Sequence, residues 1–186
     1  MIVEPLPYEP KLQTRPLERI DLAVIHCTEL PDLAAAREYG ERILYDSGTG
    51  NSGHYYIDRD GSVHRWIEPT CIAHHVRGCN ERAIGIELVN AGRYPDWLAS
   101  NRQHMTEAYA EAQIDALVAL LHGLQLRIPT LRYIAGHEDL DREQVPASDD
   151  PAIQVRRKLD PGSLFPWQRV LREVRLERLA SPDAPV

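Results

Sequence analysis

The chain is predicted to adopt an α/β fold, a single domain in which a central mixed β-sheet is flanked by helices. Three observations predict this fold. Strand-like runs are interspersed with helix-like runs, which favours a sheet covered by helices. Two of the strand-like runs, residues 54–58 and 62–67, are joined through Asp60-Gly61, a dipeptide typical of a β-hairpin. The length of 186 residues suits one domain, since domains usually have roughly 100–200 residues.

The chain begins with an expected extended arm. Residues 1–19 contain four prolines and isolated apolar residues, so we expect them to lie along a domain formed by residues 20–180. The first predicted strand, residues 22–27, is apolar and partly β-branched, and it ends in His26-Cys27-Thr28. The spacing of apolar residues over 31–45 then predicts a helix, which stops before a glycine-rich run.

The hairpin and a central strand follow. The Asp60-Gly61 pair is expected to form a type I′ turn, which needs positive φ at its centre. Residues 83–90 are predicted to form a central strand because they are almost entirely apolar. Glu87 is the exception in that run, and an ionised carboxylate is costly to bury, so this residue is a candidate for a function.

The second half of the chain contains the clearest helix, residues 106–126. Its apolar side chains recur at the spacing of a stripe that faces a core: Ile114, Leu117, Val118 and Leu121. Residues 132–135 are a predicted strand that leads into Gly136-His137. A last helix is expected after Pro166, a residue that suits the first turn, and residues 181–186 are expected to be a frayed tail.

Composition excludes several classes of partner. The net charge of −7 argues against binding to nucleic acid or an anionic membrane, since both require clustered Lys and Arg. No stretch approaches the roughly 18 apolar residues needed to span a bilayer. The first residues lack the pattern of a signal peptide, so a cytoplasmic location is expected. The three cysteines, Cys27, Cys71 and Cys79, form no CxxC pair and are expected to be free thiols.

The eight histidines differ in their sequence context. His26 and His137 each lie at the end of a predicted strand, where an α/β sheet presents functional side chains to a crevice. His64, His104 and His122 lie at hairpin or helix positions without acidic or glycine neighbours, so we expect surface or packing roles for them. The two strand ends therefore supply the first candidate site residues.

Two such imidazoles suggest a metal site. A catalytic zinc usually takes three protein ligands from imidazole and carboxylate and keeps a fourth position for water. Asp160, in Leu159-Asp160-Pro161-Gly162, is a candidate carboxylate, although an Asp before Pro-Gly is also typical of a turn. Three further carboxylates beside His137 are rivals: Glu138, Asp139 and Asp141. Spacing alone does not decide between these carboxylates.

Five segments, in sequence order, carry a resemblance to a known family. They are Val24-Ile25-His26-Cys27-Thr28, Ser52-Gly53-His54-Tyr55-Tyr56-Ile57 with Asp60-Gly61, Ile84-Gly85-Ile86-Glu87-Leu88-Val89-Asn90, Gly136-His137, and Lys158-Leu159-Asp160-Pro161-Gly162 with Phe165-Pro166-Trp167. Together they resemble the zinc N-acetylmuramoyl-L-alanine amidases of the AmpD-like family, which is related to the peptidoglycan recognition proteins. Each motif alone is weak, but five in order, from about residue 21 to 171, are specific.

The resemblance implies an amidase or peptidoglycan-recognition type of fold and a bound Zn²⁺. It also implies hydrolysis of the amide bond between N-acetylmuramic acid and L-alanine, in peptidoglycan or its muropeptide fragments. Carried over by position, it makes His26, His137 and Asp160 the zinc ligands and gives Glu87 and Lys158 catalytic roles. Zinc activates a bound water, a carboxylate can move its proton, and a lysine can stabilise the oxyanion, so these residue types suit the reaction.

The resemblance also assigns substrate contacts. His75 falls where the family has a substrate-contacting histidine, and His54 and Tyr55 of the second segment are assigned to substrate binding as well. This sequence departs from the pattern at His74, which stands where the family has an aromatic residue. Residues 139–153 also form a longer and more acidic linker than the family has, so we expect a different rim there.

Two other functions stay open at this point. The first alternative to the amidase is a module that binds muropeptide without cutting it. The second is a zinc hydrolase that cuts another peptide amide. Three retained candidate ligands favour the amidase over the first of these. The substrate is either intact peptidoglycan or small 1,6-anhydro fragments, and the expected cytoplasmic location favours the fragments.

Overall fold

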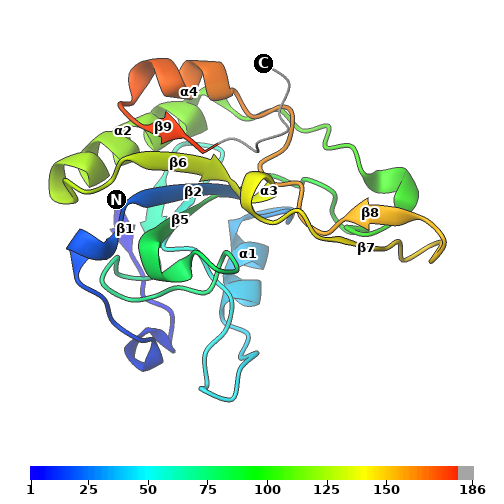
Figure 1. Cartoon of the computed structure of the whole chain (residues 1–186), viewed down its shortest axis with the longest axis horizontal. Helices are drawn as coiled ribbons and strands as arrows, with labels where there is room; N and C mark the ends of the chain where they lie inside the picture. The colour runs from blue at the N-terminus through cyan, green and yellow to red at the C-terminus, as the bar shows by residue number, and fades with distance from the viewer. Residues whose placement is uncertain (180–186) are drawn as a thin grey trace.

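A mixed β-sheet forms the centre of the protein (Figure 1). The computed structural model describes residues 1–179, so the expected tail at 181–186 lies outside the described residues. Within residues 1–179, seven strands form this sheet in the order β1 (Ile2–Val3), β4 (Val63–Arg65), β3 (Tyr55–Ile57), β5 (Ala83–Leu88), β2 (Leu22–Cys27), β6 (Tyr133–Gly136) and β9 (Glu177–Arg178). Neighbouring strands are parallel except for the antiparallel β3–β4 hairpin, which confirms the predicted mixed sheet.

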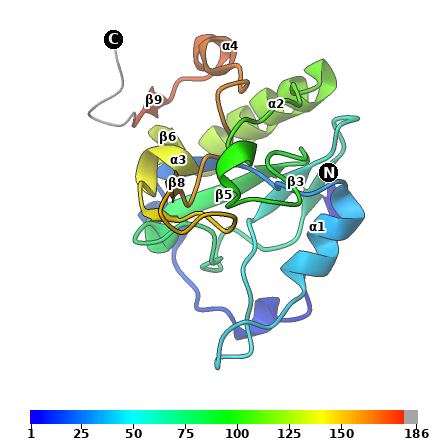
Figure 2. The same cartoon turned by 90° about the vertical axis from the view of Figure 1, so that its right-hand side faces the viewer.

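Helices cover both faces of the sheet (Figure 2). On one face, α2 (Glu111–Arg127) and α4 (Trp167–Glu173) pack onto β2 and β5 through a large apolar core that includes Ile25, Ile86 and Leu117. On the other face lie α1 (Leu33–Gly40) and the N-terminal arm, which share a second apolar cluster. The short α3 (His137–Leu140) follows β6 directly. Among the described residues, no helix is long and apolar enough to cross a bilayer.

The arm at residues 1–19 is not purely extended. Its first residues form β1, which pairs with β4 at the edge of the sheet, and Leu6, Tyr8 and Leu12 are buried. Four short 3-10 turns occur in the described part of the chain, at Glu9–Lys11, Leu17–Arg19, Asn80–Arg82 and Ser100–Arg102. The arm therefore contributes both a strand and core side chains to the domain.

The predicted helix at residues 31–45 is too long. Asp32 caps α1 by accepting a hydrogen bond from the Ala35 N–H, which explains where the helix begins, but the helix ends at Gly40. The apolar residues expected on its buried face instead lie in the following loop, where Ile43 and Leu44 are 56% and 57% exposed. Apolar spacing alone was misleading here because these side chains do not pack into the core.

The turn between β3 and β4 also differs from the expectation. Among the residues of the turn only Gly61 has a positive φ, at +86°, whereas a type I′ turn needs two such residues. The Gly61 N–H donates to the Asp58 carbonyl and the Asp58 N–H to the Ser62 carbonyl. This pattern is that of a type I turn followed by a left-handed glycine, so the hairpin is confirmed and the type I′ turn is wrong.

The linker at residues 139–153 contains structure that its composition did not predict. After α3, strands β7 (Gln144–Pro146) and β8 (Gln154–Arg156) form a separate antiparallel hairpin. The predicted helix at 106–126 begins later than expected, at Glu111, and the strand at 132–135 is shifted by one residue to Tyr133–Gly136. The hairpin projects beyond the end of the sheet (Figure 1).

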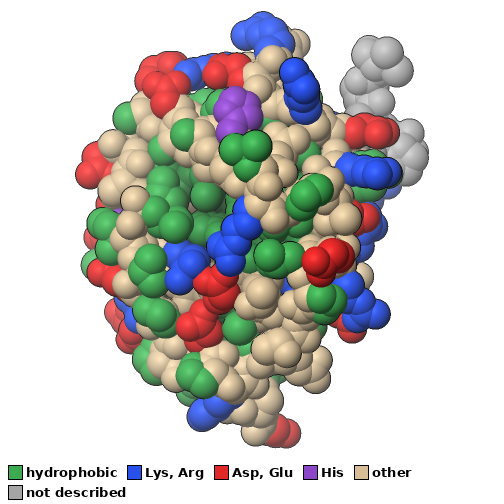
Figure 3. Space-filling view, turned by 90° about the vertical axis from the view of Figure 1, so that its left-hand side faces the viewer, with side chains coloured by type: hydrophobic (Ala, Val, Ile, Leu, Met, Phe, Trp, Pro, Cys, Tyr) green, Lys and Arg blue, Asp and Glu red, His purple; other side chains and the backbone are tan. Residues whose placement is uncertain are grey.

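Charged side chains of both signs are mixed on the surface. On the face seen in Figure 3, Lys and Arg side chains lie between Asp and Glu side chains and do not gather into one basic area. Clustered basic residues are what nucleic acid and anionic membranes require.

Candidate active site

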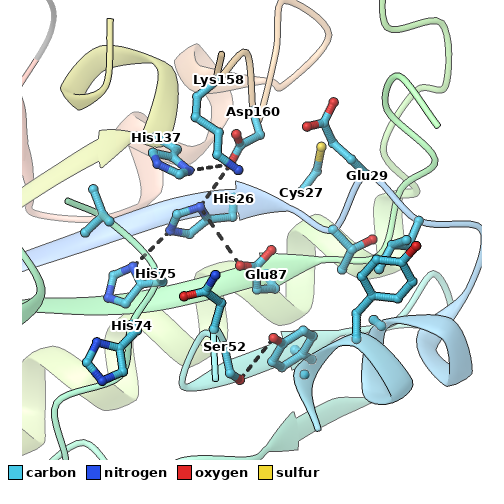
Figure 4. Close-up of a pocket in the computed structure, with 18 of the residues that line it drawn as sticks. His26, Cys27, Glu29, Ser52, His74, His75, Glu87, His137, Lys158 and Asp160 are labelled. Carbon is cyan, nitrogen blue, oxygen red and sulfur yellow. Dashed lines mark hydrogen bonds and ion pairs between the residues drawn. The ribbon is translucent and has the colours of Figure 1, made fainter. Parts of the chain in front are cut away.

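The carboxyl ends of β2 and β5 open into a cavity of about 550 Å³. Its wall is made by the strand ends, the loop after α1, the loop at residues 74–80 and the segment that follows β8. Six of the predicted site residues line it (Figure 4): His26, His75, Glu87, His137, Lys158 and Asp160. This position matches the general rule that ligands of α/β sheets bind beyond the carboxyl ends of the strands.

Two imidazoles and one carboxylate converge at the bottom of the cavity. His26, His137 and Asp160 each offer one ligand atom, and these atoms lie within 4.8 Å of one another. The Asp160 Oδ2 atom lies 2.9 Å from His26 Nδ1 and 3.1 Å from His137 Nδ1. All three residues are buried, with exposed fractions of 2–3%. Residues 134 positions apart therefore meet at one point.

The sheet topology explains this convergence. β2 and β6 are parallel neighbours with Ile25 opposite Gly136, so His26 and His137 both follow that pair at the same edge of the sheet. The Asp160 carbonyl accepts a hydrogen bond from the Glu138 N–H, which ties the third residue to α3. A side chain at Gly136 would come within 2.9 Å of Pro161, so glycine permits this close approach.

The donor set fits a zinc ion. Burial is the main reason that the pKa of His26 falls from its usual 6.5 to about 4, so this imidazole is neutral at pH 7 and free to bind a metal. Burial acts to raise the pKa of Asp160, but the charge and hydrogen bonds of His137 and His26 outweigh it and hold that pKa well below its usual range. Asp160 Oδ1 and His137 Nε2 are buried without a hydrogen-bond partner among the described residues. A bound cation would satisfy such a carboxylate.

Glu87 lies beside this cluster. β5 pairs with β2 so that Glu87 is directly opposite His26, and its Oε1 atom lies 4.0 Å from His26 Nδ1. Burial, with a smaller contribution from the charge of Asp160, raises the pKa of Glu87 from 4.5 to about 8. Such a carboxyl group can both accept and release a proton near neutral pH, as a general acid–base must. The anomalous charge in an apolar strand thus faces the cavity.

His75 contacts the predicted metal ligand His26. Its Nδ1 atom lies 3.0 Å from His26 Nε2, on the side of the ring that faces away from Asp160. The ring fits because residue 85 is glycine, since a Cβ there would lie 2.7 Å from the His75 ring. The Asn80 side chain accepts from the backbone N–H groups of His75 and Val76 and so fixes the loop. His75 lines the cavity and also orients a predicted ligand.

The structure does not place His54 and Tyr55 at the cavity. His54 is fully buried, where its Nδ1 accepts from the Gly85 N–H and its Nε2 faces the Cys71 carbonyl at 3.1 Å. Tyr55 is 2% exposed and belongs to the core under α2. Side chains alternate between the two faces of a strand, so the cavity-facing residue of β3 is Tyr56. His54 and Tyr55 therefore do not line the cavity, and the structure adds no support to their substrate-binding assignment.

Tyr56 was missed from the sequence, although strand alternation points to it. It lies opposite Glu87 in the β3–β5 pair, so His26, Glu87 and Tyr56 form a row across three strands. Its hydroxyl group accepts from the Gly53 N–H and lies 3.1 Å from Ser52 Oγ. The row brings three polar side chains to one face of an otherwise apolar sheet.

Two of the three rival carboxylates have other partners. Asp139 accepts from the Gly136 N–H and lies 3.3 Å from Arg178, and Asp141 is paired with Arg157. Within residues 1–179, the group of side chains close enough to share a metal does not include them. The three cysteines are free thiols, as expected, and Cys27 is buried next to His26.

A buried ion pair fixes the loop segment that carries Lys158. Arg93 donates to both carboxylate oxygens of Glu29, at 2.6 and 2.9 Å, and the two side chains are 1% and 8% exposed. The same guanidinium donates to the carbonyls of Arg156 and Arg157, at 3.0 and 3.2 Å. Arg93 thus connects the end of β2 to the residues immediately before Lys158, and nothing in the local sequence predicted this.

Comparisons with known proteins agree with this site. Residues 16–163 match the protein family described as N-acetylmuramoyl-L-alanine amidase. The chain is 28% identical over 134 residues, 67% of its length, to the 1,6-anhydro-N-acetylmuramyl-L-alanine amidase AmpD of Haemophilus influenzae. It is 36% identical over 94 residues, 50% of its length, to the N-acetylmuramoyl-L-alanine amidase AmiD of Escherichia coli. The matched regions cover 59% and 28% of these two relatives, less than two thirds of either.

Solved structures of amidases share the fold of this chain. A selenomethionine derivative of AmpD superposes with a TM-score of 0.66 at 24% identity, over 93% of each chain. AmiD of E. coli, in complex with the substrate anhydro-N-acetylmuramic acid-L-Ala-D-γ-Glu-L-Lys, gives a TM-score of 0.62 at 24% identity, over 83% of this chain and 57% of that one. At these identities the likeness concerns the fold alone.

Proposed function

The chain belongs to the N-acetylmuramoyl-L-alanine amidase family, and from this membership we propose that it hydrolyses the amide bond between N-acetylmuramic acid and L-alanine. The substrate class is peptidoglycan or its muropeptide fragments. The observation that carries the proposal is the convergence of His26, His137 and Asp160 on one point, with Glu87 opposite His26. The substrate bound in the E. coli AmiD structure has this type of bond, which supports the choice of amide.

The metal-binding step is assigned to three side chains. His26 and His137 would hold a zinc ion through imidazole nitrogens and Asp160 through its carboxylate, a set typical of catalytic zinc. Zinc held there supplies Lewis acidity, which polarises a carbonyl group and lowers the pKa of water. The hydrogen bond to His75 keeps the His26 ring in the orientation that points Nδ1 toward the cluster.

Proton transfer is assigned to Glu87. Its carboxylate accepts a proton from the attacking water and passes that proton to the amide nitrogen as the C–N bond breaks, so that L-alanine leaves as a neutral amine. The position of Glu87 beside the cluster, and a pKa raised mainly by burial to about 8, suit both steps. Lys158 lies above Asp160 in the cavity wall (Figure 4), where its ammonium group can stabilise the negative oxygen of the tetrahedral state.

The direct test is product analysis. The zinc-loaded protein is incubated with a muramoyl-L-alanyl peptide, and the expected product is a peptide with a free L-alanine amine. A cut at a different amide would instead support a hydrolase of another specificity. Binding without any cut, in the presence of zinc, would make the chain a recognition module and defeat the proposal.

The Glu87→Gln variant tests the role of the carboxylate. We expect zinc content to be retained and turnover to fall by about 10²–10⁴-fold, the usual contribution of general acid–base catalysis. Glu81→Gln is the matched control, because the Glu81 side chain, in the 3-10 turn Asn80–Arg82, is 77% exposed. Loss of zinc from Glu87→Gln, measured by elemental analysis, would show that Glu87 is a ligand and not the proton carrier.

A further inference from the structure

Aromatic side chains gather at the outer edge of the cavity. Tyr39, Tyr45 and Tyr94 are 37%, 44% and 43% exposed. Exposed apolar side chains that gather in one area are typical of binding sites. Tyr39 and Tyr45 line the cavity itself. Trp97 lies between Tyr39 and Tyr94, with ring centroids 6.3 and 5.8 Å away. We call these four residues the aromatic rim.

The rim is built from three separate segments and is held in place. The Tyr45 hydroxyl donates to Asn51 at 2.5 Å, and its backbone N–H donates to the Thr49 carbonyl within the same loop. The Trp97 Nε1–H donates to the Glu29 carbonyl at 2.9 Å. Preorganised aromatic rings of this kind lose little entropy when they bind a ligand. Tyr45 and Trp97 are therefore held in place, and the Arg42 guanidinium packs over the Tyr39 ring, 3.5 Å from its centroid.

The rim also accounts for the departure at His74. The family pattern expects an aromatic residue there, and the sequence has histidine. In the structure the Tyr45 ring packs against the His74 ring, with centroids 5.0 Å apart. Tyr45, from the loop after α1, thus supplies an aromatic surface next to this position.

We propose that the aromatic rim binds the glycan strand of peptidoglycan by stacking, so that the protein prefers substrates with several linked sugars over a single-disaccharide fragment. This inference rests on the proposed function, which places one sugar at the cavity. A polymer continues outward from that sugar, and the rim is continuous with the cavity on one side. The rim thus selects the polymeric form of the substrate.

The chemistry of the rim favours sugars over other occupants. Pyranose rings present a face of C–H groups that packs on aromatic rings while their hydroxyl groups stay in water, and tyrosine offers both a ring and a hydroxyl. The ring centroids of Tyr39, Trp97 and Tyr94 follow one another at 6.3 and 5.8 Å with ring planes inclined by 67° and 70°, so the rings offer separate contacts along a chain and not one flat platform. The net charge of −7 disfavours a strongly anionic polymer, whereas the glycan backbone is uncharged.

Binding without turnover gives the first test. In the Glu87→Gln background, affinity is measured for β-1,4-linked N-acetylglucosamine hexamer and dimer by calorimetry. We expect the hexamer to bind on the order of tenfold more tightly, and Tyr94→Leu to reduce that preference by about 3–10-fold, the scale of one aromatic contact. Tyr94→Trp retains a ring and should retain the preference. Leu126→Ala is the control, since Leu126 is 87% exposed on α2, away from the rim.

Turnover gives the second test and separates this inference from the proposed function. In the wild-type background, Tyr94→Leu should lower kcat/KM for polymeric peptidoglycan about 3–10-fold more than kcat/KM for a single muropeptide, through KM. Equal affinity for hexamer and dimer would overturn the inference, as would equal losses on both substrates. A wild-type dimer that Tyr94→Leu dissociates, seen by light scattering, would also overturn it, because the rim would then be a protein interface. Failure to cut either substrate, with the hexamer preference intact, would refute only the proposed reaction.

Discussion

Replacing Arg93 with methionine removes the cation that holds Glu29 and the segment before Lys158. The pair is almost fully buried, with side-chain exposures of 1% and 8% and N–O distances of 2.6 and 2.9 Å. Removing one partner of a buried ion pair typically costs about 3–5 kcal/mol, because the other charge is left in the interior. Two backbone carbonyls, of Arg156 and Arg157, also lose their donor. Glu29 borders the cavity, so water can reach its carboxylate. We therefore expect Arg93→Met to lower the free energy of unfolding by about 3 kcal/mol, the lower end of that range.

The assay is urea unfolding of the metal-free protein, followed by circular dichroism, with the m-value as a check on two-state behaviour. The double variant Glu29→Gln/Arg93→Met should be more stable than Arg93→Met by about 1–2 kcal/mol, because the stranded charge is gone. Arg19→Met is the control: its partner Glu81 is 77% exposed, so the cost should stay below about 1 kcal/mol.

A functional measurement accompanies the stability measurement. Arg93→Met should keep its zinc, since Arg93 does not touch the cluster, but lower kcat by displacing the residues that carry Lys158. A loss of stability no larger than that of Arg19→Met, or a double variant as unstable as the single one, would refute the reasoning. In that case the pair would not be desolvated in solution.

Three further predictions concern the interior. Burial, and then the charge of Arg15, lowers the pKa of His54 from 6.5 to about 3 in the folded protein. Between pH 6.5 and pH 3 the unfolded chain therefore carries a proton on His54 that the folded protein lacks. The free energy of unfolding should fall as pH drops from 6.5 toward 3, with up to about 1.4 kcal/mol per pH unit from this residue, and His54→Asn should show a shallower slope in pH-dependent unfolding. Asp160→Ala should bind zinc weakly or not at all, so zinc should no longer raise the melting temperature of this variant. If zinc raised it as much as in the wild type, Asp160 would not be a ligand. Gln113→Leu removes the side-chain donor of the Ile57 and Val89 carbonyls, of which the Ile57 carbonyl keeps the Val89 N–H, and should cost about 1–3 kcal/mol in urea unfolding. A cost within about 0.5 kcal/mol would mean that water replaces the amide.

Local sequence patterns were sufficient for the strands that position the site. The strand at Leu22–Cys27 was predicted with its observed bounds because the run is apolar, β-branched and bounded by polar residues. Its last positions are where His26 was singled out, and the same argument gave His137 after β6. Patterns of this kind indicate that each histidine lies at a strand end, but they do not state that the two strands are neighbours.

Other parts of the site depend on contacts that no local pattern contains. Arg93 and Glu29 are 64 residues apart, and each reads as an ordinary surface residue in its own segment. The choice of Tyr55 where the structure places Tyr56 at the cavity has a different cause, since the strand was predicted and only the phase of its alternation was unknown. The helix predicted over 31–45 failed because apolar residues at 43–45 were read as core, whereas the structure leaves them exposed beside the cavity.

The row of His26, Glu87 and Tyr56 joins the site to the core of the fold. The residues that precede them in each strand, Ile25, Ile86 and Tyr55, all lie in the core under α2. A slip of β5 by one residue would move the Glu87 carboxylate into that core and an isoleucine into the cavity, at the cost of burying a charge. The apolar packing under α2 therefore fixes the register that sets Glu87 opposite His26. Core substitutions that loosen β5 should lower turnover even where they touch no residue of the cavity.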